Sequence, residues 1–284
     1  MKPFKDCVAG IAGMGIMGGA FAMALGRLAP RRLLACDTGR KPLDAALADK
    51  VIDEGFTDAA AMLRQCDFLY LCINPSQALP FMETHISDFK RGALITDIAG
   101  VKGTIAHRIE VLLREDLDYI PGHPMAGSEK GGYEQAKKCV FRGKNYILTP
   151  LKRNKKENLE YLKDLIRRMG FGSITETTAE EHDRNIAFTS QLCHVIAAAL
   201  IDSEADTAIA RFGGGSFEDL TRIAMLNAPM WTELFLENRN ELLKRIAQFQ
   251  GSLDALTSLI AGEESVLLEE RLQAVRERRA AMKA

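Results

Sequence analysis

The stretch GHPMAGSEKGG at residues 122–132 places one histidine among glycines and polar side chains. Histidine titrates near neutral pH, so it can accept a proton during a catalytic cycle. Pro124 follows His123 directly and favours an extended backbone there, which fixes the position of the imidazole. The glycines let a substrate and a cofactor approach the backbone closely. We therefore expect His123 to be a catalytic proton acceptor, with a structural histidine as the alternative.

A second candidate site is the run GMGIMG at residues 13–18, which has the form GxGxxG. It follows the short apolar run of residues 8–12 and leads directly into an amphipathic segment. In that context the first glycine makes a tight turn, the second lets the backbone approach a pyrophosphate, and the third allows close packing of helix on strand. The N–H groups at the helix start can bind the anion. Glycines that serve only a tight turn are the alternative.

The ends of later apolar runs extend this predicted cofactor site. Residues 33–36 lead into Asp37, whose carboxylate can accept hydrogen bonds from the adenosine ribose and repel a 2′-phosphate, which favours NAD over NADP. Arg40 lies nearby and weakens that preference. Two further runs end at residues 71–75 and 97–102, and ligands of parallel sheets lie at the carboxyl ends of strands. The predicted cofactor-binding residues are Gly13, Met14, Gly15, Ile16, Met17, Gly18, Asp37, Ile73, Asn74, Pro75, Ile98 and Gly100.

The elements that must position these residues alternate as far as residue 177. Apolar runs typical of strands are separated by amphipathic segments, which indicates an α/β fold with a doubly wound parallel sheet of the Rossmann type. Helices are expected over residues 16–28, 42–50, 58–65, 77–89, 102–114 and 154–169. From residue 178 the pattern is helical only, and it opens with a capping box of Thr178 and Glu181. The sequence therefore predicts a Rossmann domain over residues 1–177 and an all-α domain over residues 178–284.

The composition bounds the function classes. Apolar residues make up 47% of the chain and charged residues 26%, as in soluble globular proteins. A net charge of −1 gives no general attraction to nucleic acid or to a membrane. No uninterrupted apolar run approaches the roughly 18 residues that span a bilayer, and the N-terminus lacks signal-peptide features, so we expect a cytoplasmic protein. The cysteine and histidine spacings predict no metal site.

Several motifs, taken in order, resemble the prephenate dehydrogenase family. They are GxGxxG, DIAGVK at residues 97–102, GHPMAGSEKGG, FRGKNYILTP, DRNIAFTSQLCHVIAAAL, GGGSFEDLTRIA and MWTELFLEN. The resemblance covers nearly the whole chain. It implies NAD-dependent oxidative decarboxylation of prephenate to 4-hydroxyphenylpyruvate, with release of CO₂, as a step in tyrosine synthesis. It also implies a homodimer that forms mainly through the all-α dimerisation domain, residues 178–284.

The resemblance implies roles for individual residues. His123 matches the family's catalytic histidine, which bonds the ring hydroxyl of the substrate, and Arg222 matches its carboxylate-binding arginine. A surface ion pair is the alternative for Arg222, and core positions are the alternatives for His194 and Trp231. Gly100 stands where many members carry serine, while Gln191 and Cys193 stand where histidine and proline are common. The expected substrate-binding residues are Ser128, Glu129, Ser190, His194, Arg222 and Trp231.

Three alternative functions remain open on the sequence. An arogenate dehydrogenase would share the fold and mechanism and act on a substrate with an amino group in place of the keto group. A β-hydroxyacid dehydrogenase would share the strand–helix opening and the helical second half, but that group relies on a lysine of a long helix. A non-catalytic NAD-binding sensor would not require His123 or Arg222.

Overall fold

The computed structural model describes residues 1–127 and 131–282. The chain divides by its contacts into two compact units, Met1–Asn238 and Arg239–Ala284. This division follows the density of contacts, whereas the predicted boundary after residue 177 follows the change from mixed strands and helices to helices alone. The predicted boundary therefore stays a prediction. Two predicted substrate-binding residues, Ser128 and Glu129, lie outside the described residues.

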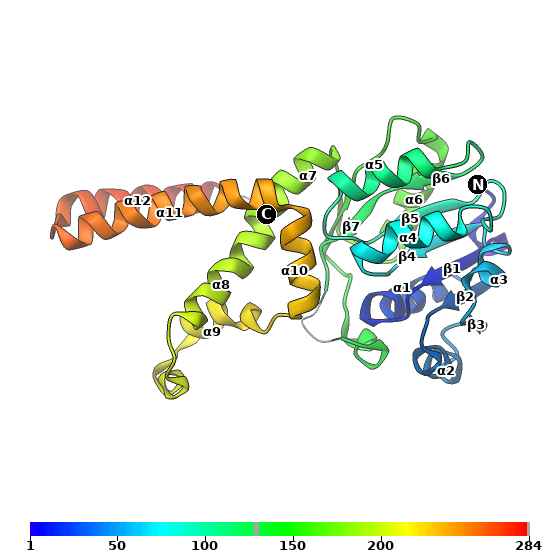
Figure 1. The fold of residues 1–284 in the computed structure, drawn as a ribbon, viewed down its shortest axis with the longest axis horizontal. Helices are drawn as coiled ribbons and strands as arrows, with labels where there is room; N and C mark the ends of the chain where they lie inside the picture. The colour runs from blue at the N-terminus through cyan, green and yellow to red at the C-terminus, as the bar shows by residue number, and fades with distance from the viewer. Residues whose placement is uncertain (128–130, 283–284) are drawn as a thin grey trace. The chain divides into compact units, whose positions relative to one another are not determined.

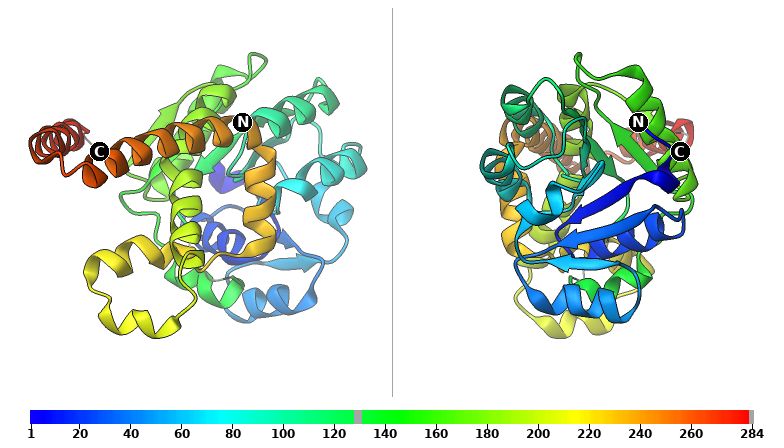
Figure 2. Two further views of the ribbon diagram at one scale, coloured as in Figure 1. Left: turned by 60° about the vertical axis from the view of Figure 1, so that its left-hand side comes forward. Right: turned by 90° about the vertical axis from the view of Figure 1, so that its right-hand side faces the viewer.

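A parallel sheet organises the first unit, with the strand order β3-β2-β1-β4-β5-β6. Every neighbouring pair in this sheet is parallel. This is the order of a Rossmann sheet, in which the direction of winding reverses between β1 and β4, and it confirms the predicted fold class. Figure 2 shows several of these strands side by side. The strands are β1 (Val8–Ala12), β2 (Arg32–Cys36), β3 (Glu54–Phe56), β4 (Phe68–Leu71), β5 (Leu94–Asp97) and β6 (Asp118–Ile120).

Helices cover both faces of this sheet (Figure 1). Side chains of β1 alternate between the faces: Ala9 and Ile11 join the core under one set of helices, and Val8 and Ala12 join the core under the other. Such alternation follows from the two-residue period of a strand. One face holds α1 (Ile16–Gly26), α2 (Arg40–Ala48) and α6 (Lys156–Arg168), and the other holds α3 (Ala59–Leu63), α4 (Pro75–His85) and α5 (Gly103–Leu112).

A smaller sheet follows, in the order β7-β8-β9. Its strands are β7 (Gly122–Pro124), β8 (Asn145–Leu148) and β9 (Ser173–Glu176). His123 lies in β7 and pairs with Ile147 of the antiparallel strand β8, which confirms the extended backbone predicted before Pro124. The short strands β3, β7 and β9 were not predicted because they lack an apolar run.

The chain from residue 178 is helical in its described part, as predicted. The Thr178 hydroxyl accepts a hydrogen bond from the backbone N–H of Glu181 at 3.1 Å, which confirms the Thr178 half of the predicted capping box. The Glu181 carboxylate accepts a hydrogen bond from the Thr177 hydroxyl at 2.8 Å. The first unit then contains α7 (Ala179–Ile186), a π-helical segment (Ala187–Gln191), α8 (Leu192–Asp202), α9 (Gly215–Thr221) and α10 (Ala228–Glu237). The second unit consists of the helices α11 (Arg239–Ala261) and α12 (Ser265–Ala281).

The helix Ala179–Asp202 is the one segment of the described residues that could cross a membrane by length and composition, with a mean hydropathy of 1.3. The sequence was expected to contain no such segment. The difference arises because hydropathy is averaged over the helix, whose apolar residues are interrupted by polar ones such as Asn185 and Gln191. Core helices of soluble proteins meet the same criterion, so a single helix is a weak indication of a membrane span.

Candidate active site

The glycine loop between β1 and α1 has the geometry that its sequence predicts. Gly13 has a φ of +91°, in the left-handed region, and a Cβ there would lie 2.4 Å from the carbonyl oxygen of Cys72. A Cβ at Gly18 would lie 1.8 Å from the carbonyl oxygen of Gly13, so this position requires glycine for packing. A Cβ at Gly15 would meet nothing within 4 Å. Packing therefore explains the first and third glycines, and the open space at the second fits the approach of a ligand.

The start of α1 is suited to bind an anion. Gly15 is its N-cap, no side chain caps the helix, and the first turn carries no acidic residue. The N–H groups of the first turn therefore lack a side-chain cap, and the helix dipole adds a partial positive charge there. Ile16 and Met17 are partly exposed at this end, whereas the side chain of Met14 is buried in the core. These features fit the pyrophosphate of a dinucleotide.

Asp37 lies beside this loop, directly after β2. Its Oδ2 accepts a hydrogen bond from the N–H of Met14 at 2.7 Å, and its Oδ1 accepts one from Gly39 at 2.8 Å. An ionised carboxylate has further lone pairs, so both oxygens can still accept a ribose hydroxyl. The nearby Arg40 forms an ion pair with Asp44 at 2.8 Å on its own helix. The Arg40 guanidinium, which weakened the predicted preference for NAD over NADP, is thus paired with a carboxylate of its own helix.

The predicted residues after β4 and β5 line the same end of the sheet. Asn74 is the exposed N-cap of α4, Pro75 is buried at its first turn, and Ile73 is partly exposed. The carboxylate of Glu233 in α10 accepts a hydrogen bond from the N–H of Ser76, so the helical region reaches this end of α4. Ile98 and Gly100 follow β5, and both are partly exposed.

His123 faces the end of β5. A Cβ added to Gly100 would lie 3.8 Å from Nε2 of His123 and 3.2 Å from the side chain of Leu234 in α10. The structure therefore brings together a predicted catalytic residue and a predicted cofactor residue. The imidazole Nδ1 points the other way and lies 2.9 Å from Nε2 of His182. Nε2 of His123 is the ring atom on the side of Gly100, a predicted cofactor-binding residue.

Sequence reasoning missed a polar cluster behind His123. His182 is buried, and its Nδ1 lies 2.7 Å from Oδ1 of Asp183. The Asp183 carboxylate also accepts hydrogen bonds from the backbone N–H groups of Lys102 at 2.8 Å and Gly103 at 2.7 Å, at the start of α5. Asp183 and Lys102 stand in the motifs DRNIAFTSQLCHVIAAAL and DIAGVK, but the sequence does not show that they lie together, because His182 and Asp183 have their partners about 60 to 80 residues earlier in the chain.

A buried ion pair completes this cluster. Nζ of Lys102 lies 2.5 Å from Oδ2 of Asp97, and the two side chains are 1% and 2% exposed. Oδ1 of Asp97 accepts further hydrogen bonds from the Tyr119 hydroxyl and the Gly122 N–H, both at 3.1 Å. Asp97 therefore connects the end of β5 to the strand that carries His123.

Burial and neighbouring charges set the protonation of the two histidines. Burial lowers the pKa of His123 well below its usual range, and His182 and the Lys102 charge lower that pKa further. Burial likewise lowers the pKa of His182, although Asp183 opposes this effect. Burial also lowers the pKa of Lys102, against the attraction of Asp97. Both histidines are therefore neutral near pH 7, and a neutral imidazole is the form that can accept a proton.

Three of the predicted substrate-binding residues of the helical region, Ser190, His194 and Trp231, form a second group. The rings of His194 and Trp231 stack at 3.6 Å between centroids, and Nδ1 of His194 lies 2.9 Å from the carbonyl oxygen of Ser190. Trp231 also lies against Phe235, 5.4 Å between ring centroids. Arg222 has an exposed side chain and begins a short 3-10 segment (Arg222–Ala224) that packs against α8.

Gln191, one of the departures from the family pattern, has a structural role. Its side chain is buried, and its amide donates to the carbonyl oxygen of Leu234 at 2.8 Å. Its oxygen accepts a hydrogen bond from Asn238 at 2.8 Å. The residue therefore ties the π-helical segment to α10, which carries both Trp231 and Leu234.

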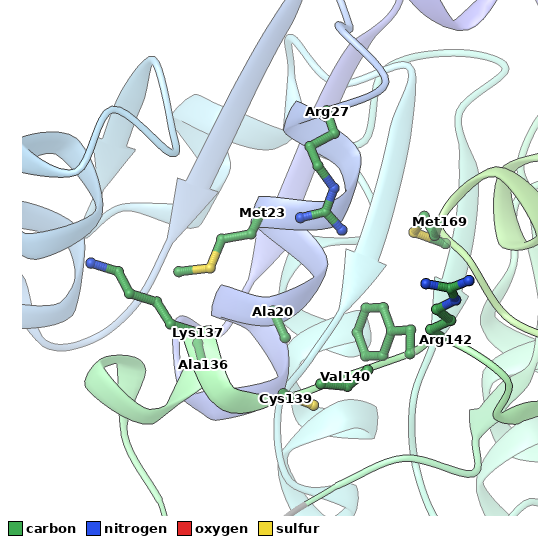
Figure 3. Close-up of a pocket in the computed structure, with 10 residues that line it drawn as sticks. Ala20, Met23, Arg27, Ala136, Lys137, Cys139, Val140, Arg142 and Met169 are labelled. Carbon is green, nitrogen blue, oxygen red and sulfur yellow. The ribbon is translucent and has the colours of Figure 1, made fainter.

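A cavity of about 240 Å³ lies elsewhere, beside α1 (Figure 3). It is lined from α1 by Ala20, Met23 and Arg27, and from later segments by Ala136, Lys137, Cys139, Val140, Phe141, Arg142 and Met169. None of the predicted site residues that the structure describes lines it, so it is separate from the described part of the candidate active site. Among the described residues, no group of three or more histidine, cysteine, aspartate or glutamate side chains is placed to hold a metal ion.

Comparison with known proteins gives the family. Residues 21–175 match the family described as "Prephenate dehydrogenase, nucleotide-binding domain", and residues 178–274 match "Prephenate dehydrogenase, dimerization domain". The prephenate dehydrogenase of Bacillus subtilis is 29% identical over 273 residues, which cover 93% of this chain and 73% of that protein.

Solved structures agree. The prephenate dehydrogenase of Aquifex aeolicus, in complex with hydroxyphenyl propionate and NAD⁺, is 30% identical with a TM-score of 0.89, and 98% of each chain is covered. An arogenate dehydrogenase from Synechocystis is 27% identical with a TM-score of 0.81, over 96% of this chain and 99% of that one. With its glycine loop and its polar cluster at the sheet end, this chain belongs to the prephenate dehydrogenase family of NAD-dependent oxidoreductases.

Proposed function

We propose that this chain oxidises prephenate with NAD, releasing CO₂ and forming 4-hydroxyphenylpyruvate, as a step in tyrosine synthesis. The observation that carries the proposal is the position of His123, whose Nε2 faces Gly100 at the end of β5. A proton acceptor at that atom lies where the glycine loop and strand ends can hold a nicotinamide. The family match supports the substrate class.

The proposed chemistry uses a neutral His123. Prephenate carries a ring alcohol opposite a ring carboxylate. Nε2 of His123 accepts the alcohol proton as hydride leaves the same carbon, and loss of the ring carboxylate as CO₂ then makes the ring aromatic. NAD, when bound, supplies the nicotinamide that accepts the hydride. General base catalysis of this kind typically contributes about 100- to 10,000-fold to the rate.

Substrate binding is proposed for the helical region and the segment after β7. Arg222 would bind a substrate carboxylate through paired hydrogen bonds, which a guanidinium forms well. His194, Trp231 and Ser190 would line the pocket. The stacked rings of His194 and Trp231, with the His194 ring held at the carbonyl oxygen of Ser190, support a shared wall. Ser128 and Glu129 are proposed as further contacts from the sequence resemblance.

The cofactor is NAD, and its contacts are proposed from the geometry of the first unit. The start of α1 would bind the pyrophosphate, and Asp37 would accept hydrogen bonds from the adenosine ribose. The open space at Gly15 supports this arrangement. The residues after β4 and β5, among them Asn74 and Ile98, would flank the nicotinamide half.

We also propose a cytoplasmic homodimer that forms mainly through residues 178–284, without nucleic acid or membrane partners. The family described as a dimerization domain covers residues 178–274. Large apolar side chains are exposed in this region of a single chain, which fits an interface between copies. They include Phe188, Leu200, Ile201, Ile209, Phe212, Leu220, Met225 and Leu236. Sedimentation of the full chain should give twice the 31.3 kDa of one copy.

The test of the function is NADH formation with prephenate and, separately, with arogenate, each with NAD and with NADP. We expect turnover with prephenate and NAD. Arogenate is the second candidate substrate because the Synechocystis arogenate dehydrogenase has the same fold over nearly the whole chain. The variant His123→Asn should lose turnover while it still binds NADH, measured by fluorescence. Undiminished NADH production by this variant would remove His123 from the mechanism and favour a sensor.

A further inference from the structure

His123 is held at the end of a hydrogen-bonded series of four groups. The backbone N–H groups of Lys102 and Gly103 donate to Asp183, at 2.8 Å and 2.7 Å. Asp183 Oδ1 lies 2.7 Å from Nδ1 of His182, and Nε2 of His182 lies 2.9 Å from Nδ1 of His123. His182 is buried, so these bonds form away from solvent.

The direction of each bond follows from the chemistry of its partners. Asp183 accepts backbone hydrogen bonds at both oxygens, as an ionised carboxylate does, and so it can only accept from His182. Nδ1 of His182 must therefore carry the proton. A neutral imidazole has one N–H, which leaves Nε2 of His182 as an acceptor. Nδ1 of His123 must then donate, and its Nε2 carries the lone pair.

We propose that His182 and Asp183 are positioning residues that fix the tautomer and the orientation of His123, so that its Nε2 is the proton acceptor. This inference deepens the proposed function, because it names the groups that prepare the base of the same site. Gly100, which faces Nε2, has no side chain to orient the ring. Within residues 1–127 and 131–282, the hydrogen bond to His182 is the one that holds the His123 ring.

The hydrogen bond between His123 and His182 also persists when His123 is protonated. When Nε2 of His123 takes the alcohol proton, the ring becomes an imidazolium, and Nδ1 continues to donate to Nε2 of His182. The proton stays on His123, and Asp183 stays ionised. The Lys102 charge opposes the new positive charge on His123. The series therefore orients the base before the reaction and keeps its hydrogen bond to His182 afterwards.

The first measurement reads the tautomers directly. ¹⁵N-labelled histidine in the full chain gives distinct NMR signals for protonated and bare ring nitrogens. We expect His123 and His182 both to carry a proton on Nδ1 and none on Nε2 near pH 7. The exposed His107, whose side chain is 78% exposed, provides a reference ring, and the variant His107→Gln assigns its signals. A proton on Nε2 of neutral His123 would overturn the proposal.

The second measurement uses a pair of variants at one position. His182→Phe keeps an aromatic ring but no acceptor, whereas His182→Gln keeps an oxygen that can accept from His123. We expect kcat to fall on the order of 10- to 100-fold in His182→Phe, as for a misplaced catalytic group, with KM and NAD binding little changed. His182→Gln should recover most of that loss. A kcat within about twofold of the parent in His182→Phe, or equal losses in both variants, would refute the positioning role.

The two measurements separate this inference from the proposed function. NMR of the chain without substrate needs no turnover, so the tautomers can be as expected while prephenate is not oxidised, and the function alone then fails. If prephenate is oxidised but neutral His123 is protonated on Nε2, the positioning role alone fails. Should His182→Phe not fold, the tautomers of the parent and the kcat of His182→Gln still decide the outcome.

Discussion

Removing one partner of the buried Asp97–Lys102 pair should destabilise the protein strongly. The two charged atoms lie 2.5 Å apart, with the side chains 2% and 1% exposed. Lys102→Met leaves the Asp97 carboxylate buried with the neutral donors Ala99, Tyr119 and Gly122. Breaking such a pair typically costs about 3–5 kcal/mol. Because three hydrogen bonds to the carboxylate remain, we expect the lower end, about 3 kcal/mol in the free energy of unfolding.

The double variant Asp97→Asn/Lys102→Met should cost much less than the two single changes added together. Asp97→Asn alone leaves the lysine buried without its counter-charge, at a similar cost of about 3 kcal/mol. With both charges gone, no uncompensated charge is buried, and methionine fills most of the volume of the lysine stem. Residues in direct contact show coupling energies of about 0.5–3 kcal/mol, and we expect this pair near the upper end.

Urea unfolding of the four proteins, followed by circular dichroism, measures this coupling. The control is the exposed pair Asp164 and Arg168, 3.4 Å apart with side chains 60% and 45% exposed. The same cycle there should give a coupling within about 0.5 kcal/mol of zero, as for i,i+4 pairs on a helix surface. If the costs at Asp97 and Lys102 add within about 0.5 kcal/mol, the two do not act as a buried pair, and the reasoning is wrong.

The same substitution should move the pH profile of the proposed reaction. The Lys102 charge lowers the pKa of His123, so its removal raises that pKa. In the proposed mechanism His123 accepts a proton only when it is neutral. Activity is therefore lost below its pKa, and the acid limb of kcat/KM in Lys102→Met should move to higher pH. A limb that stays in place or moves to lower pH would contradict the electrostatic role of Lys102.

Three further predictions concern the proposed binding sites. Arg222→Ala should raise KM for prephenate on the order of 10- to 150-fold with little change in kcat, since a charge-assisted hydrogen bond contributes roughly 1.5–3 kcal/mol; an unchanged KM would exclude Arg222 from the pocket. Asp37→Ser should raise kcat/KM with NADP relative to NAD, and a variant that still rejects NADP would point to another discriminating group. Gly18→Ala should lower the free energy of unfolding by about 1–3 kcal/mol, because its Cβ would lie 1.8 Å from a backbone oxygen. Gly15→Ala should leave the free energy of unfolding unchanged, because a Cβ there meets nothing within 4 Å, and should weaken NAD binding. Equal effects of the two variants on unfolding would contradict the separate roles of these glycines.

The parts of the fold that the sequence predicted are those encoded by local patterns. The turn at Gly13 requires a positive φ, and the glycine appears in the sequence where the apolar run ends. The cap at Thr178 needs only the Thr178 hydroxyl and the backbone N–H of Glu181, three residues later. Pro124 restricts its neighbour His123, and that residue is extended in β7. Each of these features depends on residues within a few positions of one another.

The parts that were not predicted depend on distant segments. β3 has only three residues, Glu54–Phe56, and it pairs with β2 at the edge of the sheet. β9 is largely exposed, so its letters, SITE, carry no burial pattern. β7 forms because the backbone around His123 pairs with the antiparallel strand β8. Strand pairing supplies the hydrogen bonds in these cases, and no apolar run marks the strands in advance.

The cluster behind His123 was missed for the same physical reason, and its location bears on how the two halves of the chain share the chemistry. His123 follows the main sheet, but the groups that orient it, His182 and Asp183, belong to the first helix after residue 177. Asp183 binds the N-terminus of α5, so this helix is anchored on the Rossmann region by the bonds that prepare the base. A Rossmann region alone would keep the glycine loop, Asp37 and the imidazole, yet it would lack the acceptor that holds Nδ1. Dinucleotide binding can therefore be a property of the first half, whereas the proposed proton transfer requires both.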